Sequence, residues 1–167
     1  MIISQSAEYA LRAAVLLSRA EGRPMTTQQL AETSRIPPDY LSKILQDLRR
    51  AGLVTSQRGV NGGFVLAKDP DRMTVLEVVN ALDPIERIHT CPLKLSEHGT
   101  MLCPLHRKLD EAIATVEKAF GSATLSQLAP TGAPEVDTCQ ALHPKAAKSE
   151  APSSPANTLV RRSRRPH

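Results

Sequence analysis

Aromatic residues are scarce in this chain of 167 residues: they make up 2% of the composition, with two Tyr, two Phe and no Trp. So few rings cannot build the stacking surface that binds single-stranded nucleic acid, nor the aromatic cage that binds a quaternary ammonium group. The hydrophobic fraction of 41% still suffices for the core of a soluble domain. The composition therefore predicts a globular protein without these two classes of binding site.

Long apolar runs are also missing. No segment approaches the roughly 20 consecutive apolar residues of a membrane span. Glu8 and Arg12 interrupt the apolar stretch near the N-terminus, unlike the core of a signal peptide. We therefore expect a cytoplasmic protein with no membrane partner. In such a protein the three cysteines do not form a disulfide framework, so metal ligation, redox chemistry and simple burial are their expected uses.

The sequence contains no recognisable catalytic motif. The Ser and His residues are scattered and give no nucleophile–base pair. The glycine-rich segment 59–63 lacks the Lys-Ser/Thr continuation and the following helix of a phosphate-binding loop. The sequence therefore predicts that the protein is not an enzyme.

Positive charge is unevenly distributed. Residues 1–69 hold nine basic and six acidic side chains, whereas residues 70–128 hold six and eight. Residues 129–167 add six basic and three acidic side chains, with six of the 13 prolines, and this composition predicts a disordered basic tail. Cys139 falls in the tail, which offers no rigid frame to position it. The N-terminal half is thus the better candidate for binding a polyanion.

Apolar periodicity and capping residues predict helices at residues 6–20, 27–33, 38–50, 74–82 and 104–120, with a final turn at 124–128. Two strands are expected at 53–57 and 64–67, joined by a basic, glycine-rich hairpin tip. The order of helix, turn, helix and two-stranded wing predicts a mainly α fold with a small β-hairpin, the winged helix-turn-helix. We divide the chain into a DNA-binding domain (1–82), a cysteine-containing sensor loop (83–103), a dimerisation helix with its terminal turn (104–128) and the tail (129–167).

The second helix of a helix-turn-helix lies in the major groove of DNA. Apolar spacing places Leu41, Ile44, Leu45 and Leu48 toward the core, so the opposite side of helix 38–50 presents short or polar groups to base edges and phosphates. The wing tip offers a basic side chain for the adjacent minor groove and glycines that let the backbone approach the duplex. The candidate DNA-binding residues are Thr27, Pro38, Asp39, Tyr40, Ser42, Lys43, Gln46, Arg58, Gly59, Asn61 and Gly62.

Three segments carry a more specific signal: residues 6–12 (Ser-Ala-Glu-Tyr-Ala-Leu-Arg), 36–41 (Ile-Pro-Pro-Asp-Tyr-Leu) and 58–64 (Arg-Gly-Val-Asn-Gly-Gly-Phe). They resemble the Rrf-type winged-helix transcriptional regulators, a family that includes the iron–sulfur cluster regulator IscR and the nitric-oxide sensor NsrR. The resemblance covers residues 1–128 and implies a regulator, expected to repress, that binds a two-fold related operator on double-stranded DNA as a homodimer. The alternative is a protein-interaction module that does not bind DNA.

Helix 104–120 has a feature that agrees with a homodimer. Leu105, Leu109, Ile113 and Val116 form one apolar stripe on a helix that follows a domain already closed by its wing. Such a stripe needs a partner to cover it, and pairing with the same helix of a second copy meets that need.

Cys91 and Cys103 bracket the irregular loop. Pro104 at the first helical position makes Cys103 the N-cap, where the helix dipole favours a thiolate. His106 lies three residues on, on the same side of the first turn, so it forms a chelating pair with Cys103. Thiolates suit soft cations and iron–sulfur clusters, and imidazole suits zinc or the iron of a mixed cluster.

The resemblance implies a cluster held by three cysteines about six residues apart, but Glu97 occupies the middle position, with His98 beside it. The completion of a four-ligand site is therefore open: the candidates are His106 within the loop, one of these two gap residues, and Glu8 from the partner, since some family members use an acidic residue at that position. The expected ligands are Cys91, Cys103, His106 and Glu8. The expected cofactor is a 2Fe–2S or 4Fe–4S cluster, and the alternatives are zinc or a reversible disulfide without a cluster.

Overall fold

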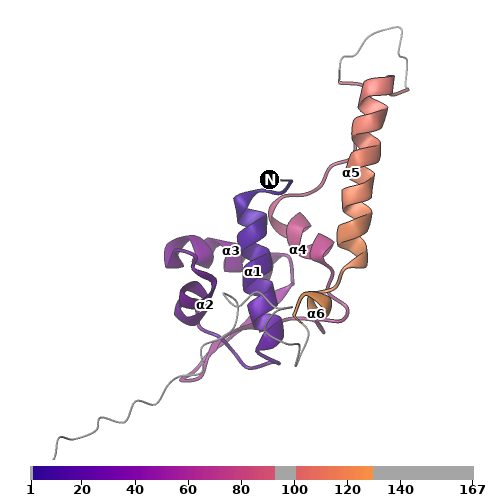
Figure 1. Ribbon diagram of the computed structural model, residues 1–167. Coiled ribbons are helices and arrows are strands. Elements are labelled where there is room, and N and C mark those ends of the chain that lie inside the picture. The colour runs from indigo at the N-terminus through magenta and orange to yellow at the C-terminus, as the bar shows by residue number, and fades with distance from the viewer. Residues whose placement is uncertain (1, 93–100, 130–167) are drawn as a thin grey trace, which may run out of the picture.

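The computed structural model describes residues 2–92 and 101–129 (Figure 1). Its elements in chain order are α1 (Gln5–Arg19), α2 (Thr27–Ser34), α3 (Pro38–Arg50), β1 (Val54–Gln57), β2 (Gly63–Leu66), α4 (Val75–Leu82), α5 (Pro104–Ser122) and α6 (Leu125–Leu128). These bounds differ from the predicted ones by at most two residues, and the predicted mainly α fold with one hairpin is confirmed. Glu97, His98, Cys139 and the predicted tail beyond residue 129 lie outside the described residues.

Local capping explains where the short helices begin. In α2 the Thr26 side chain accepts a hydrogen bond from the Gln29 N–H at 3.2 Å, and the Gln29 side chain accepts from the Thr26 N–H at 2.9 Å. Thr74 and Glu77 form the same reciprocal pair at the start of α4. Each pair satisfies two N–H groups that the first helical turn leaves without partners.

The connection between α2 and α3 is the turn of the helix-turn-helix. Arg35 ends α2 in the left-handed region, with φ 56° and ψ 40°, and the Ile36 N–H then donates to the Ala31 carbonyl at 3.1 Å. Pro38 takes the first helical position of α3, where its missing N–H costs nothing. The apolar side of α3, formed by Leu41, Ile44, Leu45 and Leu48, is buried as predicted.

The wing is a hairpin of β1 and β2, paired from Val54–Leu66 to Gln57–Gly63. On the other edge of β2, Met25 and Phe64 exchange two backbone hydrogen bonds of 3.0 and 2.8 Å. The backbones approach so closely that a Cβ on Gly63 would lie 2.5 Å from the Met25 carbonyl carbon and oxygen. Glycine is therefore required sterically at this position, and the wing is fixed to the chain just before α2.

The main core joins α1, α2, α3, β1, α4 and α6. Its largest fully buried side chains include Leu16, Leu45, Leu48, Met73 and Leu125. The last of these belongs to α6, so the chain returns to the core after α5. By contrast, α5 has no fully buried residue, and its N-terminal half extends away from the body (Figure 1). Among residues 2–92 and 101–129, none of the helices combines the length and the apolar character of a membrane-spanning segment.

Candidate functional site

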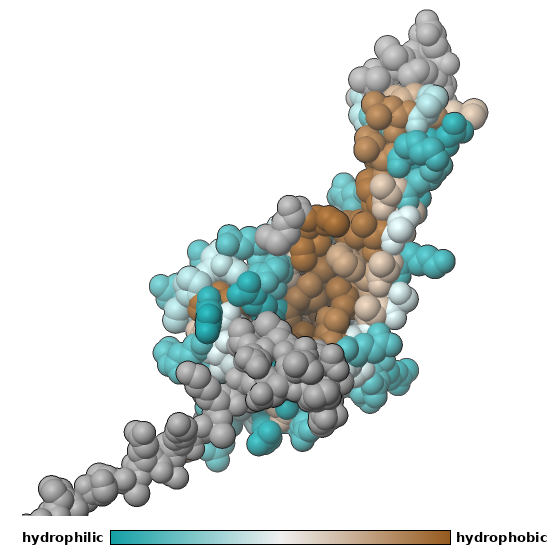
Figure 2. Space-filling model, in the orientation of Figure 1, coloured by the Kyte–Doolittle hydropathy of each residue, from teal (hydrophilic) through white to brown (hydrophobic). Residues whose placement is uncertain are grey.

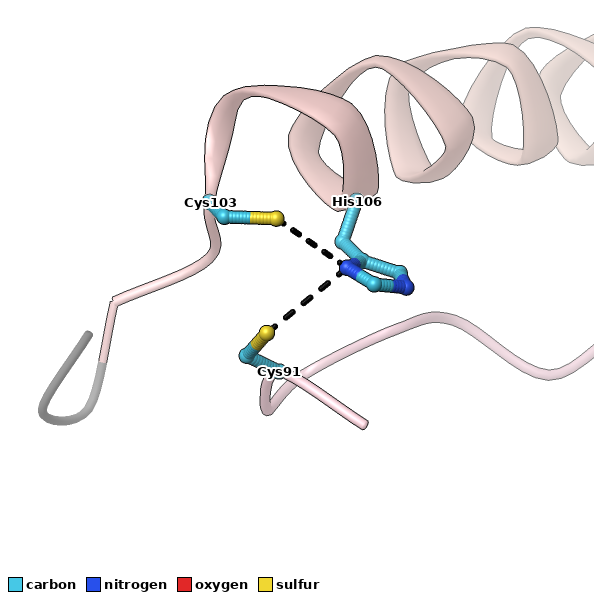
Figure 3. A group of neighbouring side chains, drawn as sticks. All are labelled: Cys91, Cys103 and His106. Atoms are coloured by element: carbon cyan, nitrogen blue, oxygen red, sulfur yellow. Dashed lines mark hydrogen bonds between the residues drawn. The ribbon is translucent and has the colours of Figure 1, made fainter. Parts of the chain in front are cut away.

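Cys91, Cys103 and His106, three of the expected ligands, come together at the N-terminal end of α5 (Figure 3). The Nδ1 atom of His106 lies 3.1 Å from the Cys103 sulfur and 3.6 Å from the Cys91 sulfur. Cys103 and His106 belong to the first turn of α5, whereas Cys91 comes from the separate segment that follows α4. The three ligand atoms lie within 4.8 Å of one another.

The start of α5 sets the chemistry of Cys103. This residue is the N-cap, in extended conformation with φ −64° and ψ 162°, and Pro104 follows at the first helical position. Its sulfur makes no regular side-chain cap hydrogen bond. The pKa of the Cys103 thiol is nevertheless lowered to about 7, first by the backbone N–H of His106, then by the His106 ring and by Cys91. A thiolate is the metal-binding form of cysteine, so the position favours ligation.

The donor set fits a soft metal centre. Cys91 is buried, and Cys103 and His106 are half-buried, so the group is partly shielded from solvent. Two thiols and one imidazole are ligands of both zinc and iron–sulfur clusters. Such centres take four ligands, so these residues supply three and leave one position for a further group.

Glu8 lies on α1 and does not belong to the Cys91–Cys103–His106 group of the described chain. Its carboxylate pairs with Arg12 at 2.6 Å. The same guanidinium donates to the Ser34 carbonyl at 3.2 Å, at the end of α2. Use of Glu8 as a ligand by a second copy of the chain stays a prediction.

An ionic cluster that was not predicted from the sequence lies close to the Cys91–Cys103–His106 group. The Arg87 guanidinium donates to both carboxylate oxygens of Asp110, at 2.7 and 2.6 Å, and the Ile88 N–H donates to Asp110 Oδ1 at 2.9 Å. Glu117 lies 3.6 Å from Nη1, the remaining nitrogen of Arg87. Arg87 lowers the pKa of Asp110 to about 2, and Asp110 in turn raises the pKa of Arg87. The available signal was the position of Asp110, one helical turn after His106.

The predicted DNA-binding residues lie on α3 and the wing, apart from Thr27, which begins α2. Asp39, Lys43 and Gln46 are exposed on α3, as are Arg58, Gly59 and Asn61 on the wing, while Thr27, Ser42 and Gly62 are half-buried. Pro38 is exposed at the start of α3. Their contacts with DNA stay predictions.

Tyr40 differs from the other candidates because it is held against α1. Its hydroxyl lies 2.6 Å from the Ser6 hydroxyl, and its ring meets the Tyr9 ring edge-on at 5.7 Å. Tyr40 still keeps 37% of its surface exposed. These contacts join the start of α3 to α1, while part of the Tyr40 side chain stays exposed.

Comparison with known proteins gives a consistent result. The sequence profile of the Rrf2 family, described as iron-dependent transcriptional regulators, matches residues 3–131. A protein of Aquifex aeolicus (strain VF5) named as an HTH-type transcriptional regulator is 30% identical over 131 residues, which is 77% of this chain and 91% of the relative. Among solved structures, CymR of B. subtilis, named the global cysteine regulator, is 30% identical with a TM-score of 0.64, covering 76% of this chain and 95% of CymR. IscR of T. potens is 25% identical with a TM-score of 0.64, covering 83% and 92%.

Proposed function

The chain belongs to the Rrf2 family of transcriptional regulators, and from this premise we propose that it binds a two-fold related operator as a homodimer and that the state of Cys91, Cys103 and His106 sets its affinity for DNA. Repression is the expected effect on transcription. Because the family and the relatives named above are regulators, the prediction that the chain is not an enzyme is confirmed. The observation that carries the sensing proposal is the convergence of three donor atoms within 4.8 Å.

The position of these donors explains how their state would reach the DNA-binding surface. When the three donors hold a common ligand, the segment that leads to Cys91 is tied to the first turn of α5. At its other end α5 runs directly into α6, where the Val75 N–H donates to the Ala123 carbonyl and the Leu125 N–H to the Met73 carbonyl, both at 2.9 Å. A change in the orientation of α5 would therefore act on the core that supports α3. In a dimer it would also change the separation of the two α3 helices.

The chemistry of the proposed centre follows from its ligands. A bound zinc ion or iron–sulfur cluster would cross-link the three side chains, and a cluster would add sensitivity to oxidation. The chain itself supplies two thiols, one of them with a pKa near 7, and an imidazole whose Nδ1 faces both sulfurs.

A thiol switch without a cluster is the second candidate. It is favoured by one specific observation, which is that both sulfurs approach the same imidazole nitrogen. Two thiols brought together in this way can form a reversible disulfide when an oxidant accepts their two electrons and two protons.

Metal and sulfide analysis of the anaerobically isolated protein, combined with its visible absorption spectrum, tests these alternatives. Iron with acid-labile sulfide and visible colour would support the cluster, and stoichiometric zinc without colour would support a zinc switch. We expect Cys91→Ala and Cys103→Ala to abolish binding of either. Cys139→Ala is the matched control, because it removes the remaining cysteine of the chain, and we expect it to keep the metal content.

Binding to the DNA upstream of the protein's own gene, followed by fluorescence anisotropy, tests the regulatory half of the proposal. The same four proteins are compared at fixed salt, because affinity for DNA depends steeply on ionic strength. We expect the Cys91→Ala and Cys103→Ala variants to differ in affinity from the unaltered protein, and Cys139→Ala to match it. Equal affinities for all four would refute sensing by this group, and a lack of binding by the unaltered protein at low salt would refute operator binding at this site.

A further inference from the structure

We propose that Arg87 and Asp110 form a clamp that positions Cys91 against Cys103 and His106. In this view the two residues are positioning residues: they contact no metal, but they set the distance between the metal-binding groups of two separate segments. The inference rests on the proposed function for the identity of the bound ligand, whereas the placement of the two sulfurs can be measured without a metal.

The clamp is a dense set of contacts between the segment before Cys91 and α5. Asp110 accepts three hydrogen bonds from two consecutive residues, two from the Arg87 guanidinium and one from the Ile88 N–H. A bidentate pair fixes the orientation of both groups as well as their distance. The added backbone hydrogen bond fixes the main chain of the segment, so sliding of the segment along α5 would break all three contacts.

The location of the clamp connects it to the donor group. On α5, Asp110 lies four residues after His106, which places the two side chains on the same face about 6 Å apart along the axis. On the other segment, Arg87 lies four residues before Cys91. The Ile85 N–H is held by Asn80 Oδ1 at 3.0 Å, so without the clamp the last fixed point lies six residues before Cys91, a tether of up to about 21 Å. With Ile88 held against Asp110, three residues remain, and these reach at most about 11 Å, which restricts Cys91 to the neighbourhood of the first turn of α5.

The segment needs such a contact because residues 83–92 form neither helix nor strand. No ladder of backbone hydrogen bonds sets the register of Cys91, unlike Cys103 and His106, whose separation is fixed by α5 itself. The side chain of Asp110 is only 16% exposed, and the low pKa given above keeps it ionised. The clamp thus provides an alignment that local secondary structure does not.

A neighbouring ion pair on α5 offers a matched control. Lys108 and Glu111 pair at 2.6 Å on the same helix, and their side chains are 77% and 52% exposed. This pair lies within α5 and crosses to no other segment. Glu111→Gln therefore removes one carboxylate next to Asp110 without touching the clamp.

Capture of a trivalent arsenical tests the distance between the two sulfurs without a metal. In the full-length chain carrying Cys139→Ala, Cys91 and Cys103 are the remaining thiols. Phenylarsine oxide forms two As–S bonds with such a pair, and its oxygen leaves as water with the two thiol protons, so no electrons are transferred. The affinity of the reduced protein for this probe is measured by competition with a small dithiol, first for the parent and then for Asp110→Asn, Arg87→Gln and Glu111→Gln.

We expect Asp110→Asn and Arg87→Gln each to weaken capture about tenfold or more, as is typical when a residue that orients a metal ligand is replaced. Glu111→Gln should bind the probe like the parent. Exchanging the charges with Arg87→Asp and Asp110→Arg together should restore part of the affinity, because the ion pair returns while the Ile88 contact does not. Circular dichroism shows whether each variant is folded. Equal capture by the parent and both folded clamp variants would overturn the proposal, as would a parent that fails to capture the probe.

A parallel titration with Co²⁺ separates this inference from the proposed function. Thiolate-to-cobalt absorption should appear in the parent and weaken in the two clamp variants in step with arsenical capture. Loss of arsenical capture in the clamp variants without any Co²⁺ band in the parent would support the clamp and contradict a metal function for the site. Weaker arsenical capture by Glu111→Gln, equal to that of Asp110→Asn, would overturn the clamp by showing a general effect of charge on α5.

Discussion

Arg58 is exposed at the tip of the wing, next to glycines, which carry no side chain that would hold the backbone away from DNA. A basic side chain there displaces counterions from DNA when the wing enters a groove, and each such contact adds about one to the slope of log affinity against log salt. We therefore expect Arg58→Ala to weaken operator binding and to lower that slope by about one. Fluorescence anisotropy at several salt concentrations measures both quantities.

Lys118→Ala is the control for this experiment, because Lys118 is an exposed cation on α5 rather than on α3 or the wing. We expect it to leave the salt slope unchanged. If Arg58→Ala also leaves affinity and slope unchanged, the wing does not contact DNA, and a protein partner becomes the better interpretation of this surface.

Asp110 makes a prediction about pH. Its pKa is about 2 in the folded chain, chiefly because of the hydrogen bond with Arg87, against about 3.9 for an unperturbed aspartate. A carboxylate with a lowered pKa binds fewer protons when folded, so its stabilising contribution is full above about pH 4 and is lost as the pH falls toward 2. The carboxyl-carbon NMR signal of Asp110 should therefore titrate near pH 2, and in Arg87→Gln it should titrate at a higher pH. A midpoint near 4 in the unaltered protein would show that the clamp is not formed in solution.

Gly63 and Gly121 predict opposite effects for the same substitution. A Cβ at Gly63 would overlap the backbone of Met25, so Gly63→Ala must shift the wing and is expected to cost about 1–3 kcal/mol. At Gly121, within α5, the added Cβ would lie 3.5 Å from a side-chain carbon of Leu76, which is an ordinary contact. Gly121→Ala should therefore stabilise by up to about 1 kcal/mol, because alanine favours the helix. Urea unfolding of both variants measures these changes, and a Gly63→Ala variant as stable as the unaltered chain would contradict the close approach.

The elements themselves were largely predictable because their signals are local. The capping pair of Thr74 and Glu77 marked the start of α4, and Pro104 marked the start of α5, so Cys103 and His106 could be placed together from sequence spacing alone. The docking of α6 carried no comparable signal, because burial of Leu125 depends on the path of the chain through α5 and back to the core.

Contacts between side chains on distant segments could not be predicted from the sequence. The contact of Cys91 with His106 depends on where the segment after α4 lies. Arg87 and Asp110 are 23 positions apart in different segments, so no periodicity in the sequence predicts their pairing. Tyr40 shows the same limitation: its spacing on α3 predicted a position on the DNA-facing side, but its hydroxyl contacts Ser6 on α1. Sequence patterns give the face of a helix, whereas the partner of a side chain depends on packing between elements.

The molecule as a whole places its sensor candidate and two of its exposed large apolar side chains, Leu105 and Leu109, on the same projecting helix. Figure 2 shows apolar surface running from the body along α5. The C-terminal part of this helix is covered by its own chain, since Phe120 packs against the cluster of Ala7, Val75 and Val79. Toward the N-terminal end, Leu105 and Leu109 remain 63% and 46% exposed. A single copy of the chain thus covers one end of α5 and leaves the other for a partner.

The proposed homodimer therefore predicts a strong effect of charge at Leu109. In a two-fold interface through α5, Leu109→Asp introduces an unpaired carboxylate from each copy. Burying two unpaired charges is strongly unfavourable, so the substitution should destabilise the dimer. We expect the variant to sediment as a monomer and to lose operator affinity by about a hundredfold or more, because each copy then binds its half-site without the linked second copy. Leu128→Asp is the matched control, since Leu128 is 44% exposed on α6, and it should remain a dimer. Analytical ultracentrifugation at the concentrations used for DNA binding gives the answer, and a Leu109→Asp variant that stays dimeric would place the interface elsewhere on the chain.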